Sequence, residues 1–230
     1  MIINKEQLKD FFIQFTYSNL KYEYDYEEVE LEKVQKVFND NEDIDSDTTA
    51  NIITAVKNHK ALYNQFEDIC NKYNGMLSIE LIKEIHGILM KGLYRKELED
   101  AGDKEGEFKK KDYVIGLFDV GAKAKEVEEK MQELVEEVNA IKITEENVYK
   151  IGAYLHNWIC WIHGFADGNG LVARFMVNYL LLMNGFNPTI FAVARKEISR
   201  YITILERFDD TQDIWEMVEL IEKNLNKILA

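Results

Sequence analysis

Proline occurs once in this chain of 230 residues, at Pro188, and glycine occurs 12 times. All-β folds such as sandwiches need turn residues every few positions, because each short strand ends in a tight turn. So few turn residues disfavour an all-β fold and favour helices. Hydrophobic residues make up 47% of the chain, which is enough to build a packed core.

Apolar residues recur every three or four positions along most of the chain, which is the spacing of one helix face. Between about residues 100 and 122 this pattern is lost, and four glycines surround the β-prone Tyr113, Val114 and Ile115. We therefore expect an all-α bundle with a small hairpin-like excursion. The expected helices cover residues 8–15, 31–38, 52–69, 79–93, 127–141, 148–162, 171–182, 198–208 and 214–228.

No proline-rich or glycine/serine-rich linker divides the chain. The acidic run at residues 39–47 is explained either as a solvated connection between helices or as a boundary between two parts of the chain. We expect an N-terminal helical arm over residues 1–45 and the main domain over residues 46–230. The aromatic residues of the arm would pack on the main domain or on a second copy, so a homodimer is one open possibility.

The charge balance limits the partners. There are 28 Lys and Arg residues against 42 Asp and Glu residues, a formal net charge of −14, which is the wrong sign for a protein that neutralises nucleic-acid phosphates. The N-terminus becomes charged too early for a signal peptide, and no uncharged stretch suits a membrane span. We expect a cytoplasmic chain with neither nucleic acid nor membrane as a partner.

The helical pattern is interrupted by the segment HGFADGNGLVAR, at residues 163–174. One helix ends at its left edge and another begins at its right edge. The first N–H groups of a helix have no partners within the helix and lie at the positive end of its dipole, so they attract an anion. Gly168 and Gly170 would let the backbone approach a phosphate closely.

Three side chains of this segment suit phosphate chemistry. Asp167 is a suitable ligand for Mg²⁺, which takes one or two carboxylates together with phosphate oxygens. Arg174 is a permanently charged fork that fits phosphate, and His163 has the pKa of a general base. Taken singly, His163 is also explained as a helix cap and Asp167 as a turn residue or cap, and Gly-Asn-Gly is common turn chemistry. A dinucleotide-binding Rossmann motif is excluded because a helix precedes the glycines, and no P-loop is present.

In order and spacing, the segment resembles the signature of the Fic (Fido) family, HxFx[D/E]GN[G/K]RxxR. The stretch from Gly106 to Lys109, followed by Val114 and Ile115, resembles the G-x-F-R segment and the β-hairpin flap of that family. Ile85-His86 and Arg200-Tyr201 are similar to further family features, so the resemblance covers roughly residues 50–220. The matching signature residues are His163, Phe165, Asp167, Gly168, Asn169, Gly170 and Arg174.

This resemblance implies a Fic-like helical bundle with a small β-hairpin flap, and an enzyme that transfers AMP from ATP to a Ser, Thr or Tyr hydroxyl of a target protein or of itself. ATP is then the co-substrate and Mg²⁺ the cofactor, with His163 as general base and Phe165 packed beneath the loop. The implied site residues are His163, Asn169 and Arg174 for catalysis, Phe165, Gly168, Asn169, Gly170 and Arg174 for the nucleotide, Asp167 for the metal, and Asp112, Tyr113, Val114, Ile115 and Gly116 for target binding by the flap.

Three residues depart from the family pattern. Leu171 replaces the first arginine of the signature, which removes a donor to phosphate worth about 1.5–3 kcal/mol. Gly164 replaces the usual proline, and Lys109 replaces an arginine. Two alternatives therefore stay open: a Fic-type transferase that uses another phosphate-containing donor, and a degenerate module that binds nucleotide or protein without catalysis.

Many relatives carry an inhibitory helix, [S/T]xxxE[G/N], whose glutamate pairs with the last arginine of the signature. The nearest candidate begins at Ser18, but Tyr22 stands at the glutamate position and Glu23 comes one residue late. One residue turns a helical side chain by about 100°. We therefore do not expect this form of inhibition, and keep a pairing of Glu23 with Arg174 as the alternative.

Overall fold

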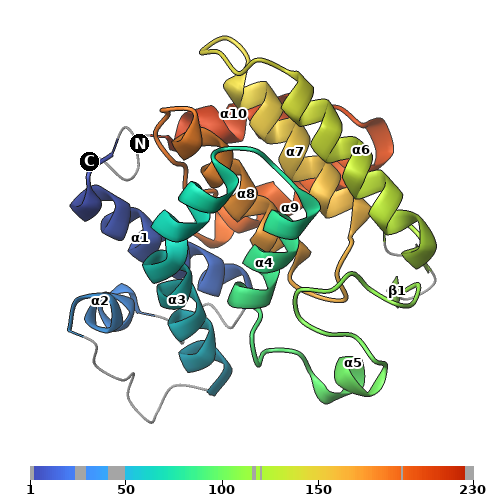
Figure 1. Ribbon diagram of the computed structural model, residues 1–230, viewed down its shortest axis with the longest axis horizontal. Coiled ribbons are helices and arrows are strands. Elements are labelled where there is room, and N and C mark those ends of the chain that lie inside the picture. Colours follow the sequence, from blue (N-terminus) through green and yellow to red (C-terminus); the bar gives the residue numbers. More distant parts are fainter. Residues whose placement is uncertain are drawn as a thin grey trace.

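The computed structural model describes residues 3–23, 30–40, 50–115, 118–119, 121–192 and 194–225. Helices α1, α2 and α3 lie on one side of the molecule and α6 and α7 on the other, with α8 between them behind α4 (Figure 1). The elements are α1 (Lys5–Glu23), α2 (Leu31–Asp40), α3 (Ala50–Tyr73), α4 (Ile79–Leu89), α5 (Lys96–Asp100), β1 (Val114–Ile115), β2 (Phe118–Asp119), the 3-10 helix η1 (Ala124–Glu126), α6 (Val127–Ala140), α7 (Val148–Ile162), α8 (Asn169–Met183), α9 (Arg195–Thr211) and α10 (Trp215–Asn224).

Each stretch of helical periodicity overlaps a helix of the structure, and the all-helical fold is confirmed. The last stretch continues to residue 228, where its final residues lie outside the described part of the chain. The periodicity missed α5 and η1, because helices of five and three residues are too short to show a repeating apolar stripe.

Strands β1 and β2 pair antiparallel, with Val114 opposite Asp119 and Ile115 opposite Phe118. Two residues in each strand make a ladder too short to establish the β-hairpin flap that the sequence predicts. Gly116, one of the expected flap residues, lies outside the described residues. The flap therefore stays a prediction.

Helix α8 forms the centre of the bundle. Thirteen of its 15 residues are buried, because its sequence is apolar around its whole circumference and other helices cover it. It packs on α7 and α4, so its N-terminus is held at a fixed place between them. None of the described helices is both long and apolar enough to span a membrane.

Helix α1 packs into the same core through a cluster of aromatic rings. The ring of Phe12 lies 5.4 Å from Phe66 of α3 and 6.1 Å from Phe175 of α8, and Phe15 lies 5.8 Å from Phe175. One hydrophobic cluster extends from Leu8 to residues of α10. A division of the chain into an arm and a domain at residue 45 stays a prediction, which the following experiment tests.

Replacing Phe12 by alanine is expected to lower the free energy of unfolding by about 3–5 kcal/mol, because a fully buried ring leaves a cavity. All three tryptophans lie beyond residue 150, so their fluorescence reports on the main domain. Urea unfolding should shift equally by tryptophan fluorescence and by circular dichroism. Ile202→Ala, on the half-exposed surface of α9, is the control and should change stability by less than about 0.5 kcal/mol. An unchanged fluorescence transition in Phe12→Ala would instead make the arm an independent unit.

Candidate active site

The loop between α7 and α8 depends on two residues with left-handed backbone angles. His163 ends α7 with φ 51° and ψ 55°, and Gly168 precedes α8 with φ 77°. A Cβ atom at position 168 would lie 2.7 Å from the sulfur of Met90, so only glycine fits there without a shift of that side chain. The chain thus turns sharply at both ends of the loop, and the signature segment occupies the turn.

The side chain of Asn169 holds the loop in shape. Its Oδ1 accepts a hydrogen bond from the Phe165 N–H at 2.8 Å, and its Nδ2 donates to the Phe165 carbonyl at 2.9 Å. Asn169 is buried, and these two bonds occupy its amide. The assignment of Asn169 to catalysis and nucleotide binding stays a prediction. Asn169 positions the loop, and Phe165 packs beneath it, fully buried.

His86 of α4 supports the loop from below, which the sequence did not predict beyond the resemblance of Ile85-His86 to a family feature. The Gly106 N–H donates to His86 Nδ1 at 2.8 Å, so the proton of the neutral ring is on Nε2, which donates to the Asp167 carbonyl at 3.0 Å. Burial lowers the pKa of His86 to about 4. Its ring stacks on Phe165 with centroids 3.8 Å apart.

The N-terminus of α8 offers unpaired donors. Within the described residues, the N–H groups of Asn169, Gly170 and Leu171 have no acceptor, and the first bond of this helix is from the Val172 N–H to the Gly168 carbonyl. Asp167 Oδ1 accepts from the Gly168 N–H at 2.8 Å. Three free N–H groups at the positive end of a 15-residue helix form a site for an anion.

His163 ends α7, at the other end of the loop from this anion site, and is closely surrounded. A Cβ atom at Gly121 would lie 2.3 Å from His163 Cβ, so the chain that leaves β2 passes directly against it. The Lys109 N–H donates to the Gly164 carbonyl at 2.8 Å on the other side. Burial lowers the pKa of His163, and the positive charge of Lys109 lowers it further, against a hydrogen bond with the Cys160 carbonyl that raises it. The ring is therefore neutral at neutral pH and able to accept a proton.

The expected flap residues are anchored at the base of the ladder. Asp112 Oδ1 accepts from the Ala124 N–H at 2.7 Å, and the Tyr113 hydroxyl donates to Asp103, which is buried. These two side chains thus hold the segment onto the domain. Val114 and Ile115 are described by their backbone pairing alone.

Arg174 lies one turn into α8 and is almost fully buried, at 3% exposure. Its Nε donates to Asn19 Oδ1 at 2.6 Å, its Nη1 to the Tyr201 hydroxyl at 3.2 Å, and its Nη2 to Glu23 Oε1 at 3.0 Å. The Tyr201 hydroxyl in turn lies 3.0 Å from His156 Nε2. The guanidinium group thus binds residues of α1 and α9, and all three of its nitrogens have a protein acceptor.

The pairing of Glu23 with Arg174, which the sequence analysis kept as the alternative, is therefore present in the structure. Ser18 does not begin the relevant turn, since its hydroxyl donates to the Ala192 carbonyl on another side of α1. Asn19 contacts Arg174 instead, and Glu23 follows it by four residues, which places both on one helix face. Three residues separate Asn19 from Glu23, as in the family pattern, but asparagine stands in the position of the serine or threonine.

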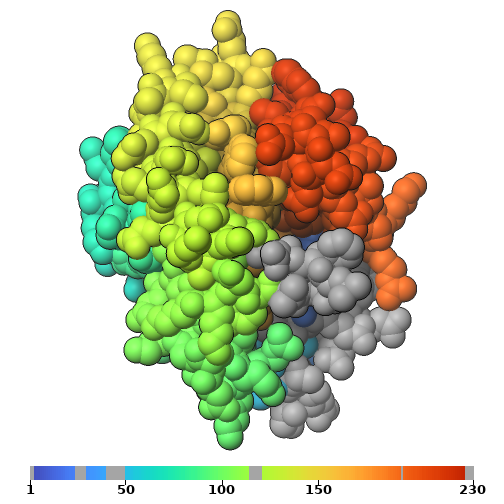
Figure 2. All heavy atoms as spheres, turned by 90° about the vertical axis from the view of Figure 1, so that its right-hand side faces the viewer, coloured from blue at the N-terminus to red at the C-terminus, as the bar shows by residue number. Residues whose placement is uncertain are grey.

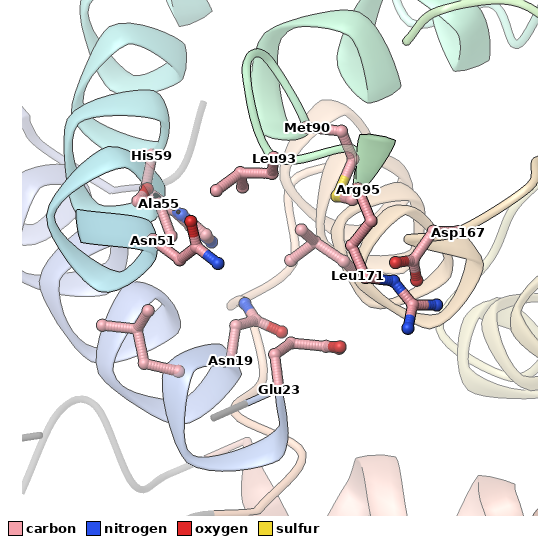
Figure 3. A pocket seen from close by; sticks show the side chains of 11 residues that line it. Asn19, Glu23, Asn51, Ala55, His59, Met90, Leu93, Arg95, Asp167 and Leu171 are labelled. Atoms are coloured by element: carbon pink, nitrogen blue, oxygen red, sulfur yellow. Dashed lines mark hydrogen bonds between the residues drawn. The ribbon is translucent and has the colours of Figure 1, made fainter. Parts of the chain in front are cut away.

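A pocket of about 220 Å³ opens beside these groups (Figure 3). Its walls come from α1, α3, the turn that follows α4, the end of the motif loop and the start of α8. Within the described residues no three His, Cys, Asp or Glu side chains form a metal-binding group, and magnesium binding by Asp167 stays a prediction. The pocket lining includes Asn19, Glu23, Arg95, Asp167 and Leu171.

A helical bundle with an anion-binding loop before its central helix is the class of protein that these observations define. Residues 76–181 match the model of the Fic/DOC family. A curated relative, protein adenylyltransferase fic-1 of Caenorhabditis elegans, is 26% identical over 126 residues, a stretch that is 54% of this chain and 23% of the relative.

Solved structures show the same fold. A Fic-domain-containing signalling protein from Bacteroides thetaiotaomicron is similar with a TM-score of 0.78 at 21% identity, over 98% of this chain and 86% of that one. Fic-1 from C. elegans gives a TM-score of 0.75 at 17% identity, over 98% of this chain and 68% of that one. At such identities the likeness shows the fold alone.

The environment of His163 is testable by NMR titration of its imidazole ring. Burial and the charge of Lys109 both disfavour the imidazolium form, so His163 should titrate below the ordinary 6.5. Lys109→Gln removes one of these causes and should raise the pKa toward 6.5. The signal is assigned by its loss in His163→Asn, and the other three histidines are distinct because burial lowers their pKa values to about 4, 4 and 3. A pKa unchanged in Lys109→Gln would contradict the proposed influence of that charge.

Proposed function

We propose that this protein is an adenylyltransferase that transfers AMP from ATP to a Ser, Thr or Tyr hydroxyl of a target protein or of itself. The proposal is carried by two features of one short loop: the neutral imidazole of His163 where α7 ends, and the three N–H groups without an acceptor where α8 begins. The similarity to protein adenylyltransferase fic-1 supports ATP as the donor. The flap segment at residues 112–116 would register the target chain by strand addition.

The chemistry follows from these two groups. His163 takes the proton of the target hydroxyl as its oxygen attacks the α-phosphorus of ATP. The bond from that phosphorus to the oxygen of the β-phosphate breaks, and pyrophosphate leaves. The N–H groups of Asn169, Gly170 and Leu171 donate to phosphate oxygens, where negative charge is held through the displacement. Arg174 binds the outer phosphates once it is released from Glu23.

Asp167 fits the role of a magnesium ligand. Its Oδ1 is oriented by the Gly168 N–H, and the carboxylate belongs to the pocket wall beside the anion site. Magnesium commonly binds one or two carboxylates together with substrate phosphates, so a single aspartate is sufficient. When bound, the ion would neutralise phosphate charge.

Glu23 is proposed to inhibit this activity. Its carboxylate occupies the Nη2 donor of Arg174 and lines the pocket, so an incoming phosphate meets a like charge and a guanidinium that is already engaged. The carboxylate side chain is 40% exposed, so it has room to withdraw from the ion pair. In this proposal, the ion pair of Glu23 with Arg174 is the inhibited arrangement.

A donor other than ATP, and a degenerate module that binds nucleotide without catalysis, are the competing functions. Leu171 favours them, because α8 lacks one phosphate donor there. Labelling separates the three. ATP carrying a radioactive α-phosphate reports transfer of AMP, UTP labelled at the same position reports transfer from another nucleotide, and calorimetry with Mg²⁺ and ATP reports binding alone.

The base is tested with His163→Asn, because asparagine tolerates the left-handed backbone angles of this position but cannot act as a base at neutral pH. We expect label from α-labelled ATP to fall by about 100-fold or more relative to the parent protein. Thermal unfolding should be nearly unchanged, which serves as the folding control. The comparison is repeated with Glu23→Gln added to both proteins. If the parent and His163→Asn are labelled equally in both comparisons, or not labelled at all, a base-catalysed enzyme is ruled out.

Inhibition is tested with Glu23→Gln, which keeps an oxygen near Arg174 but removes the charge. Labelling should rise by about 10- to 100-fold, because a charge-assisted hydrogen bond becomes available to phosphate. Asp10→Asn, on an exposed part of the same helix, is the matched control and should leave labelling unchanged. A Glu23→Gln protein that labels no faster than the parent would refute the inhibitory role.

A further inference from the structure

Arg95 belongs to the same pocket, although it lies outside the signature segment. It stands in the turn between α4 and α5, and its side chain lines the pocket together with Asp167 and Leu171. In Figure 3 its guanidinium end extends to the side of the pocket where Asp167 is drawn. Its backbone is fixed, because the Arg95 carbonyl accepts from the Leu98 and Glu99 N–H groups at the start of α5.

The charges of the pocket are unbalanced. Among the described residues that line it, Glu23 and Asp167 are acidic and Arg95 alone is basic. Arg174 lies behind this wall, buried, with its three nitrogens occupied by protein acceptors. Arg95 is exposed, and no ion pair joins it to a carboxylate within the described part of the chain. It is therefore a cation available to a ligand.

Leu171 explains why a ligand would need this cation. It lies in the first turn of α8, is 4% exposed, and offers its backbone N–H but no side-chain donor. An arginine in this place would present a full charge to phosphate, whereas the free N–H groups present only partial charges. A polyphosphate seated at the start of α8 therefore lacks a cationic side chain from α8 itself while Glu23 holds Arg174.

We propose that Arg95 binds the phosphates of the donor from the α4–α5 turn and replaces the contact that Leu171 cannot make. The inference rests on the proposed function, since it concerns the same donor. A guanidinium group is suited to the task because its fork binds two phosphate oxygens at once, and because its exposed side chain can move to meet them.

The experiment moves the charge between the two positions. Arg95→Leu is expected to weaken binding of Mg²⁺ and ATP by about 10- to 100-fold in calorimetry, as for the loss of one charge-assisted contact. Arg95→Lys, which keeps the charge but not the fork, should lose less. Adding Leu171→Arg to Arg95→Leu should restore most of the affinity. Lys96→Leu, at the exposed neighbouring residue, is the matched control and should bind like the parent.

The outcomes separate this inference from the proposed function. ATP binding and labelling that are unchanged in Arg95→Leu would overturn the inference and leave the function standing. If Arg95 acts only through Asp167, affinity will fall but Leu171→Arg will not restore it, which also overturns the inference. Inorganic tripolyphosphate is the second probe. Its binding by the parent and its loss in Arg95→Leu would support the contact even if the parent shows no labelling, in which case the proposed transferase would fail.

Discussion

A guanidinium group in the core must find acceptors for its donors, because a buried charge without partners is strongly unfavourable. Arg174 meets this requirement with Asn19 and Glu23 from α1 and with Tyr201 from α9. One residue of the signature thus joins the N-terminal helix and a C-terminal helix to the central helix. The same contacts that join these helices also occupy the group that is proposed to bind phosphate.

The anion site has a different basis, since it is made of backbone. Asn169 fixes the turn by binding both backbone groups of Phe165, and His86 holds the Asp167 carbonyl from below. Because these bonds are made by buried side chains, the free N–H groups of α8 keep their direction in the absence of a ligand. Such preorganised donors need little rearrangement when charge develops on a phosphate.

Much of this could be read from the sequence, and the exceptions have physical reasons. Helices and the signature loop are encoded by local spacing, so residues 148–182 were placed correctly by periodicity and motif. The hydrogen bonds of the Asn169 side chain to Phe165 could not be predicted, because sequence does not show which backbone groups a loop brings within reach of an amide. The pairing of Glu23 was missed because asparagine stands where the pattern requires serine or threonine. Arg95 carried no signal, since a turn residue enters the pocket only through the packing of α4 on α8.

The two carboxylates of the pocket are not equivalent, and this makes Glu23 the stronger control in this chain. Asp167 becomes favourable to phosphate once a magnesium ion accompanies the donor, whereas Glu23 has only Arg174 to neutralise it. With arginine at position 171, a phosphate could still bind a guanidinium on α8 while Glu23 held the other. With Leu171 it meets only backbone dipoles there, equivalent to about half a charge. Under the proposed inhibition, the ion pair of Glu23 with Arg174 would therefore withhold the whole cationic side-chain contribution of α8, and release of Glu23 would restore it in a single step.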